Sequence, residues 1–212
     1  MRRLPVYLVL DTSGSMSGEP IEQVKNGVQM LVSALRQDPQ ALETAYLSVI
    51  TFDSCAKEVV PLTDLPSFQA PDISANGLTA MGEALALVAD CAKRDVVKAS
   101  ATKKADWRPM VFLMTDGSPT DDIEKGIARF KEERWGAIVG CAVDGGDTDI
   151  LKRIAGEAVV RLDTSDSNAL AAFFKWVTAS ISTSSKSVQT TGKEVEGLSQ
   201  LPPPPPEIQV VV

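Results

Sequence analysis

The sequence has no histidine among its 212 residues, and this absence removes several kinds of catalysis. Ser-His-Asp and Cys-His arrangements need an imidazole as general base, so the chain cannot build either from its own side chains. The usual zinc sites draw on histidine and clustered cysteine, and they are excluded for the same reason. The sequence also lacks a G-x-x-x-x-G-K-[ST] loop, the motif that cradles nucleotide phosphates.

Cysteine is scarce as well. The three cysteines, Cys55, Cys91 and Cys141, are odd in number, far apart, and form no C-x-x-C pair. Cys91 and Cys141 lie inside apolar runs, so we expect buried free thiols rather than disulfides or metal ligands. This usage is typical of a reducing compartment. The apolar stretch near the start is too short for a signal peptide and is interrupted by Asp11, so we expect a cytoplasmic protein.

Long apolar runs and an excess of positive charge are also missing. No run approaches the about 18 apolar residues that cross a bilayer. The net charge of −7 disfavours nucleic acid and anionic membrane surfaces as partners, because both attract clustered Lys and Arg. With 44% hydrophobic and 23% charged residues, the composition is that of a globular protein with a sizeable core.

Apolar strands alternate with amphipathic helices along the chain. The predicted strands are 5–10, 44–52, 56–63, 110–114, 137–143 and 158–162, and the predicted helices are 20–36, 80–98, 121–133, 149–156 and 167–181. Most of these strands are apolar throughout, which indicates an α/β fold with a doubly wound, mostly parallel sheet covered on both faces. The short turn at Asp53-Ser54 indicates a hairpin, so strand 56–63 should be antiparallel to its neighbour.

The composition changes at about Thr183. We therefore expect one α/β domain over residues 1–182 and a flexible Ser/Thr- and Pro-rich tail over residues 183–212, because the tail has little apolar content. Pro202–Pro206 should be a stiff polyproline II spacer or a ligand for an aromatic groove. Alternatively, Ile208–Val212 adds as a strand to the sheet edge of a partner.

Three oxygen-bearing side chains follow the first predicted strand at alternate positions. Asp11, Ser13 and Ser15 fall at i, i+2 and i+4. In an extended backbone this spacing turns all three oxygens to one side. Hard oxygen ligands at the end of a strand suit Mg²⁺. The same residues also fit a polar turn in which Asp11 and Ser13 only hydrogen-bond to local backbone.

A second acid, Asp116, follows the strand 110–114, and Thr79 lies on the loop that enters the intervening helix. In doubly wound sheets, ligands bind at the carboxyl ends of strands where the strand order switches direction. If the two strands are neighbours there, these side chains share one crevice with the serines. A divalent ion held mainly by neutral hydroxyls keeps positive character, so it seeks another carboxylate, supplied by another protein. We therefore predict a metal-bridged docking site made of Asp11, Ser13, Ser15, Thr79 and Asp116.

The run Asp-Thr-Ser-Gly-Ser from Asp11, with Thr79 in Gly-Leu-Thr-Ala-Met-Gly and Asp116 in Met-Thr-Asp-Gly, resembles the von Willebrand factor A domain and its metal-ion-dependent adhesion site (MIDAS) over about residues 4–182. The resemblance implies a Rossmann-like sheet with one antiparallel edge strand. It also implies that the serines and the threonine bind Mg²⁺ or Mn²⁺, that the two acids act directly or through water, and that an Asp or Glu of a protein partner completes the shell.

The stretch from Leu4 to Met16 looks like the bacterial tellurium-resistance (TerY-like) branch of that family. This similarity implies a role in a stress-response complex, with a kinase or phosphatase of the same gene cluster as partner.

Two other functions compete with this interpretation. Mg²⁺ near strand-end carboxylates also serves phosphoryl transfer. A phosphatase of the haloacid-dehalogenase type would carry a second acid two residues after Asp11, where this chain has Ser13, so we expect no enzymatic activity. The second alternative is a metal-independent scaffold that binds through the Pro-rich tail, and metal removal with EDTA would distinguish it.

Overall fold

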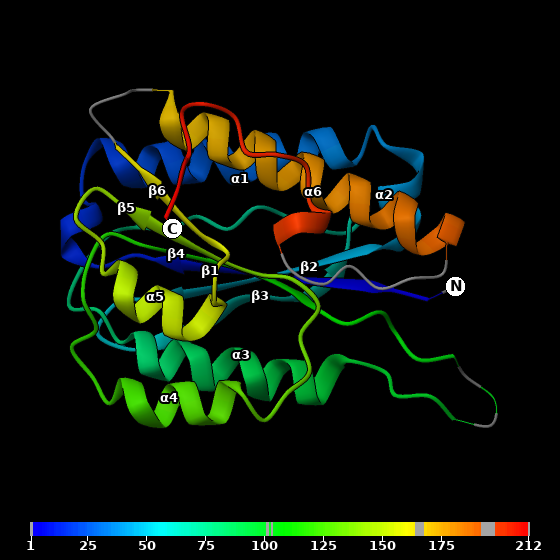
Figure 1. Cartoon of the computed structure of the whole chain (residues 1–212), viewed down its shortest axis with the longest axis horizontal. Coiled ribbons are helices and arrows are strands. Elements are labelled where there is room, and N and C mark those ends of the chain that lie inside the picture. Colours follow the sequence, from blue (N-terminus) through cyan, green and yellow to red (C-terminus); the bar gives the residue numbers. More distant parts are fainter. Residues whose placement is uncertain (1, 101, 103, 164–167, 192–197, 212) are drawn as a thin grey trace.

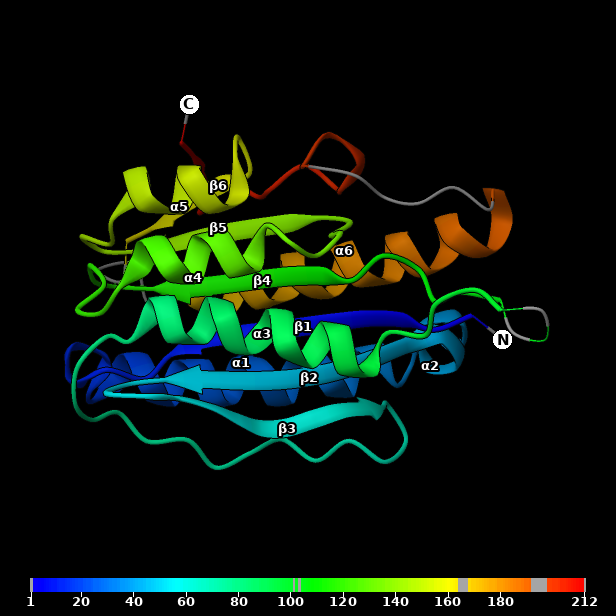
Figure 2. The ribbon, with the colours of Figure 1, turned by 90° about the horizontal axis from the view of Figure 1, so that it is seen from below.

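A computed structural model describes residues 2–100, 102, 104–163, 168–191 and 198–211. Its centre is a seven-stranded sheet with the order β3-β2-β1-β4-β5-β6-β7 (Figures 1 and 2). The strands are β1 Leu4–Asp11, β2 Ala45–Phe52, β3 Ala56–Asp64, β4 Met110–Thr115, β5 Ile138–Val143, β6 Val159–Leu162 and β7 Gln209–Val210. The five central strands are parallel to one another, and β3 and β7 run antiparallel at the two edges.

Helices cover both faces of the sheet. They are α1 Glu19–Leu35, α2 Pro39–Thr44, α3 Met81–Asp95, α4 Ile123–Phe130, α5 Thr148–Ala155 and α6 Ala169–Thr191, with 3₁₀ turns η1 Gly14–Met16 and η2 Leu198–Gln200. Figure 1 shows α1, α2 and α6 on one face and α3, α4 and α5 on the other. The predicted α/β class with a doubly wound, mostly parallel sheet is confirmed, and β3 is the predicted antiparallel edge strand.

The central strands are mostly apolar because both of their faces are covered. In β1, Val6 and Leu8 belong to the core under α1 and α6. The alternate residues Tyr7 and Val9 belong to the second core, under α3 and α4. Successive side chains of a strand point to opposite faces, so one short run of sequence supplies two hydrophobic cores.

β1 is the point at which the strand order reverses. It pairs with β2 on one side and with β4 on the other, both in parallel. The chain passes from β1 outward to β2 and β3, and later returns to β4 on the opposite side of β1. The carboxyl ends of β1 and β4 are therefore neighbours, which is the arrangement that the sequence argument requires for Asp11 and Asp116 to meet.

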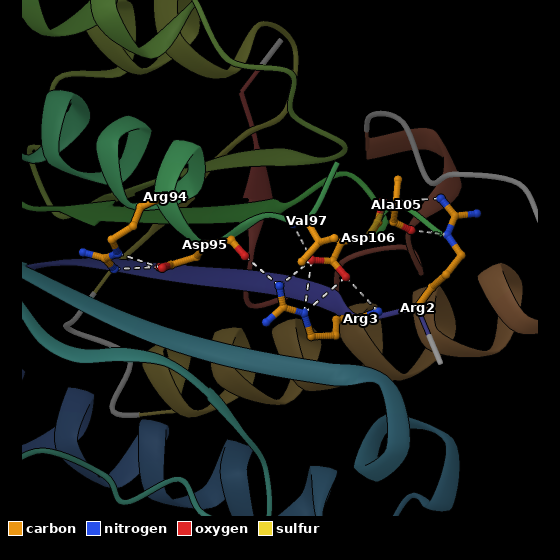
Figure 3. A network of polar contacts seen from close by, with 7 residues as sticks. All are labelled: Arg2, Arg3, Arg94, Asp95, Val97, Ala105 and Asp106. Atoms are coloured by element: carbon orange, nitrogen blue, oxygen red, sulfur yellow. Dashed lines mark hydrogen bonds and ion pairs between the residues drawn. The ribbon is translucent and has the colours of Figure 1, made fainter. Parts of the chain in front are cut away.

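The opposite ends of β1 and β4 are fastened by a network around Asp106 (Figure 3). Arg3 Nη2 donates to Asp106 Oδ2 at 2.6 Å and to the Asp95 carbonyl oxygen at 2.6 Å. The same Asp106 oxygen accepts a 2.8 Å bond from the Val97 amide, and Arg2 Nε donates to the Ala105 carbonyl oxygen at 2.6 Å. These bonds hold the loop between α3 and β4 against the start of β1. They help to set the register of β1 against β4 at the end of the sheet opposite to the predicted site.

The C-terminal part of the chain differs from the flexible tail predicted after residue 182. Helix α6 continues through that boundary to Thr191, and Ser184, Ser185 and Val188 on it are buried. The boundary between 182 and 183 is therefore wrong. It was placed on composition, but small hydroxyl side chains pack against a neighbouring helix or sheet without a large apolar face.

The segment 198–211 also packs on the domain. Leu201 and Ile208 are 7% and 4% exposed, and Trp176 Nε1 donates to the Pro202 carbonyl oxygen at 2.8 Å. Gln209 pairs with Arg161 of β6, so this strand extends the chain's own sheet rather than that of a partner. Without β7, the outer edge of β6 would leave its backbone N–H and C=O groups unpaired, and the composition of the tail does not show that this edge is available to it. The tail residues 192–197 and 212 lie outside the described residues.

Three further findings complete the fold. Helix α2 was not predicted. Pro39 lies in its first turn, and its capping residue Asp38 accepts a 3.0 Å bond from the Gln40 amide.

Cys91 and Cys141 are buried free thiols, as predicted. Across the described ranges, none of the helices combines the length and the hydropathy that a bilayer crossing needs.

Candidate metal centre

Asp11 ends β1 as a fully buried acid. Its Oδ1 accepts a 2.8 Å hydrogen bond from the Ser13 amide, and its Oδ2 accepts a 2.6 Å bond from Thr115 Oγ1 at the end of β4. Burial raises the pKa of the Asp11 carboxyl above its usual value, the bonds from Thr115 and Ser13 oppose that shift, and the Asp116 charge adds to it. A cation in contact with this carboxylate would favour the ionised form and reverse the shift.

A chain of hydroxyl groups leads from Asp11 to the surface. Ser13 Oγ and Ser15 Oγ are hydrogen-bonded at 3.0 Å, and Ser15 Oγ donates to Asp116 Oδ1 at 2.8 Å. Ser13 is 2% exposed, whereas Ser15 is an exposed residue and Asp116 is half-buried. The cluster is thus closed at its Asp11 end and open to solvent at its Ser15 and Asp116 end.

Thr79 reaches the same place from the loop before α3. Its Oγ1 lies 3.6 Å from the position that a Cβ on Gly117 would take, and Gly117 directly follows Asp116. The backbone is held in both directions, because the Thr79 amide donates to Thr120 Oγ1 at 3.1 Å and the Thr120 amide donates to the Thr79 carbonyl oxygen at 2.9 Å. The structure therefore joins Asp11, Ser13, Ser15 and Asp116 by hydrogen bonds and places Thr79 beside Gly117, the neighbour of Asp116. That these five residues form one metal site stays a prediction.

The loop that carries Asp116 is fastened to α3 by a residue that sequence reasoning misassigned. In the sequence, Asp121 or Thr120 followed by Glu124 predicts a capping box in which one of the first two residues caps the helix that follows. Instead, the Asp121 carboxylate accepts bonds from the first amides of α3, from Gly82 at 2.9 Å and from Glu83 at 2.7 Å. The cap of α4 is Asp122, which accepts a 3.1 Å bond from the Lys125 amide. Two adjacent aspartates both fit the local capping pattern, and only the neighbouring helix distinguishes them.

Two supporting residues were not identified from the sequence. Thr115 on β4 donates a hydrogen bond to Asp11 on the adjacent strand β1, and Thr120 Oγ1 accepts one from the Thr79 amide. A hydroxyl at the carboxyl end of a strand, directly before a candidate ligand, was the available signal for Thr115. For Thr120 the sequence carried no signal, because its partner lies 41 residues away.

The donor set is made of oxygen, with two carboxylates and three hydroxyls. Such a set fits a hard divalent cation that keeps positions for water or another ligand. Within the described part of the chain, no group of three or more His, Cys, Asp or Glu side chains is gathered to hold a metal. A cation here would thus depend on the hydroxyl groups of the cluster, as the sequence pattern indicated.

Comparison with known proteins identifies the fold family. The model of the von Willebrand factor type A domain matches residues 6–176. A curated relative, the uncharacterized protein sll0103 of Synechocystis sp. (strain ATCC 27184 / PCC 6803 / Kazusa), is 37% identical over 123 residues, which cover 55% of this chain and 26% of that protein. The chain thus spans about a quarter of the length of that relative.

Solved structures of low sequence identity share the fold. A von Willebrand factor type A protein from Catenulispora acidiphila has a TM-score of 0.65 at 20% identity, over 86% of this chain and 43% of that one. Proximal thread matrix protein 1 from the mussel byssus, solved with a zinc-occupied MIDAS motif, has a TM-score of 0.56 at 20% identity, over 84% and 46% of the two chains. Because the family model covers most of the sequence, this chain belongs to the von Willebrand factor type A domain family, whose members are commonly metal-dependent protein-interaction modules rather than enzymes.

Proposed function

We propose that this chain is a protein-interaction module whose docking depends on a divalent cation, Mg²⁺ or Mn²⁺. The proposed ligand set is Asp11, Ser13, Ser15, Thr79 and Asp116. The observation that carries the proposal is the continuous set of hydrogen bonds from Asp11 through Ser13 and Ser15 to Asp116. The Ser13, Ser15 and Asp116 oxygens already lie within hydrogen-bonding distance in succession, and the Ser13 amide holds the Asp11 carboxylate beside them, so little rearrangement is needed for them to share a cation.

The ligands divide into a fixed end and an open end. Asp11 is buried and oriented by Thr115 and the Ser13 amide, so it anchors the cluster. Ser15 and Asp116 are reached by solvent, so a partner would approach from their side. The cation supplies a positive centre that two carboxylates alone would lack, and an Asp or Glu of the partner binds to it. The chain contributes orientation and charge balance, with no group placed as a general acid or base.

The metal assignment draws on the chemistry of the donors and on a relative. Mg²⁺ and Mn²⁺ favour carboxylate, hydroxyl and water oxygens. The mussel protein holds zinc in its MIDAS motif, which supports a divalent cation at the corresponding place in this fold. The all-oxygen set of this chain favours Mg²⁺ or Mn²⁺ over zinc, which prefers nitrogen and sulfur ligands.

We further propose that the module works in a bacterial tellurium-resistance or stress-response complex in the cytoplasm, with a kinase or phosphatase of the same gene cluster as partner. This rests on the similarity of the stretch from Leu4 to Met16 to that branch of the family. The three cysteines are free thiols, which suits a reducing compartment.

The contacts of the described residues favour neither alternative function. A scaffold that binds through its Pro-rich tail needs that tail to be available, but Leu201 and Ile208 are buried and the Pro202 carbonyl oxygen is bonded to Trp176. A phosphatase needs an acid where Ser13 lies, and Ser13 is engaged with Ser15.

A pull-down from the cells that make the protein tests this function. The full chain is used as bait in Mg²⁺, in EDTA, and as the variants Ser13→Ala and Ser17→Ala, and the captured proteins are identified by mass spectrometry. Ser17 is an exposed serine of the same loop outside the ligand set, so it is the matched control. We expect the same partner in Mg²⁺ for the wild type and Ser17→Ala, and its loss in EDTA and in Ser13→Ala. Equal capture in EDTA would contradict the proposal.

A further inference from the structure

The loops around the candidate metal centre form a continuous surface, here called the metal-site rim. It comprises residues 12–18, 53–55, 76–80, 116–122 and 144–147. The loops are tied to one another: the Gly14 amide donates to the Gly77 carbonyl oxygen at 3.1 Å, and the Ala80 amide donates to the Asp53 carbonyl oxygen at 2.7 Å. Ser118 Oγ donates to Asp147 Oδ2 at 3.3 Å. A partner that places a carboxylate on the metal must therefore lie against this rim.

The rim carries charge of one sign only. Its loops contain no Lys or Arg, and they hold Asp53, Asp116, Asp121, Asp122, Asp144 and Asp147. Asp121, Asp122 and Asp147 cap the N-termini of α3, α4 and α5, respectively. Each helix N-terminus is equivalent to about half a positive charge. Together with one divalent cation, three such termini leave the six rim aspartates and buried Asp11 with an excess of negative charge.

The rim also presents one large apolar side chain to solvent. Leu78 is 61% exposed, more than any other large hydrophobic residue of the described chain. Its backbone is held, because its amide donates to Ser54 Oγ at 3.2 Å. The preceding Gly77 has a φ of +73°, and a Cβ there would overlap the Ser54 hydroxyl. Leu78 is thus an exposed apolar group on a constrained loop, directly beside the candidate ligand Thr79.

We propose that the partner segment combines three features: the metal-binding Asp or Glu, flanking Lys or Arg in place of further acids, and an apolar side chain that packs on Leu78. This inference rests on the proposed function, because it describes what surrounds the carboxylate that the cation takes. A second acid in the segment would meet uncompensated negative charge, whereas a basic residue is attracted to it. Covering Leu78 removes apolar surface from water on both partners.

A peptide array measures these preferences on the full-length chain. Each peptide has a central Asp and a neighbouring Leu, with either Lys/Arg or Glu in the flanks, and control peptides carry Asn at the centre. We expect Mg²⁺-dependent capture that favours basic over acidic flanks by about tenfold at low salt, with a smaller ratio at high salt. Peptides with a central Asn should not be captured.

Three variants separate the contributions of Leu78 and of the rim charges. Leu78→Ser should reduce capture of the Leu-containing peptides by about tenfold. Met30→Ser makes the same kind of change at an exposed apolar residue of α1, away from the rim, and should change nothing. The double variant Asp53→Asn/Asp122→Asn should reduce the preference for basic flanks. It should keep the fold, because Asn accepts the same backbone bonds about as well as Asp.

Mg²⁺ binding to the same proteins, measured by calorimetry, distinguishes the two proposals. Absence of Mg²⁺ binding would overturn the proposed function and this inference with it. Mg²⁺ binding with equal capture of basic and acidic flanks, or with no peptide captured, would overturn this inference and leave the metal site standing. An equal loss in Leu78→Ser and Met30→Ser would overturn the role of Leu78.

Discussion

The metal-site rim and the C-terminal segment 198–211 are held in place by different kinds of interaction. The rim follows strand ends, and it is bonded to the strand-end residue Asp11 through Ser13, two residues that the sequence marks with a recognisable pattern. The C-terminal segment is held by two buried side chains, Leu201 and Ile208, and by pairing of β7 with β6. From this comparison we expect that substitutions in the rim affect the proposed binding more than stability, whereas substitutions in the segment affect stability more than binding.

The largest expected effect is on the binding side. Replacing Asp116 with Ala removes a charged ligand, so Mg²⁺ affinity measured by calorimetry should fall by at least about 100-fold. Asp116 is half-buried and does not belong to either hydrophobic core. Its replacement should therefore change the melting temperature by less than about 2 °C. Asp122→Asn, in the same loop, is the control and should bind Mg²⁺ like the wild type. Unchanged affinity in Asp116→Ala would remove Asp116 from the site.

The next largest effect is expected on the stability that the C-terminal segment provides. Ile208→Asp places a charge at a 4% exposed position and should cost about 2–3 kcal/mol, which lowers the melting temperature by about 4–12 °C. Mg²⁺ affinity should not change. Val210→Asp, at a position that is 42% exposed, should cost less than half as much. Equal melting temperatures for wild type and Ile208→Asp would mean that this segment contributes no stability.

A smaller effect, on both stability and Mg²⁺ affinity, is expected at Asp121. Asp121→Ala removes the acceptor for the Gly82 and Glu83 amides, which links the Asp116 loop to α3. We expect about 1 kcal/mol of lost stability from the cap and about a tenfold loss of Mg²⁺ affinity from the displaced loop. Asp122→Ala, which removes the cap of α4, should cost similar stability with less effect on affinity. Equal affinities in the two variants would refute a positioning role for Asp121.

The smallest effect concerns one hydrogen bond of the C-terminal segment. Trp176→Phe removes the donor to the Pro202 carbonyl oxygen and should cost about 1 kcal/mol. Hydrogen exchange should become faster in residues 198–211. Trp135→Phe loses a comparable 2.8 Å bond to the Phe130 carbonyl oxygen in the other core, and it should leave exchange in that segment unchanged. Similar exchange in the two variants would show that the Trp176 bond does not hold the segment.

The sequence predicted the features that depend on local pattern. The apolar runs of β1 and β4 indicated buried parallel strands, and the strand-end position of Asp11 and Asp116 predicted their meeting, because the switch point follows from the topology of such sheets. The ligand spacing of Asp11, Ser13 and Ser15 lies within one loop. Its geometry therefore depends little on the rest of the fold.

The features that the sequence did not predict depend on distant partners. Asp121 was assigned to the wrong helix because the amides that it caps belong to α3, 39 residues away. The segment that forms β7 was predicted to be a flexible tail, with addition to a partner's sheet as the alternative, because nothing local shows that β6 has a free edge. In both cases the sequence carried a local signal, a capping acid at Asp121 and a short apolar run at β7. What the sequence did not show was the element with which each of them pairs.

The central claim is that five oxygen-bearing side chains share one cation, and crystals of the full chain soaked in Mn²⁺ test it most directly. The account predicts an anomalous-difference peak about 2.2 Å from Ser13 Oγ and Ser15 Oγ, with Thr79, Asp11 and Asp116 around it directly or through water. No peak at saturating Mn²⁺, or a peak only at another surface of the molecule, would contradict it.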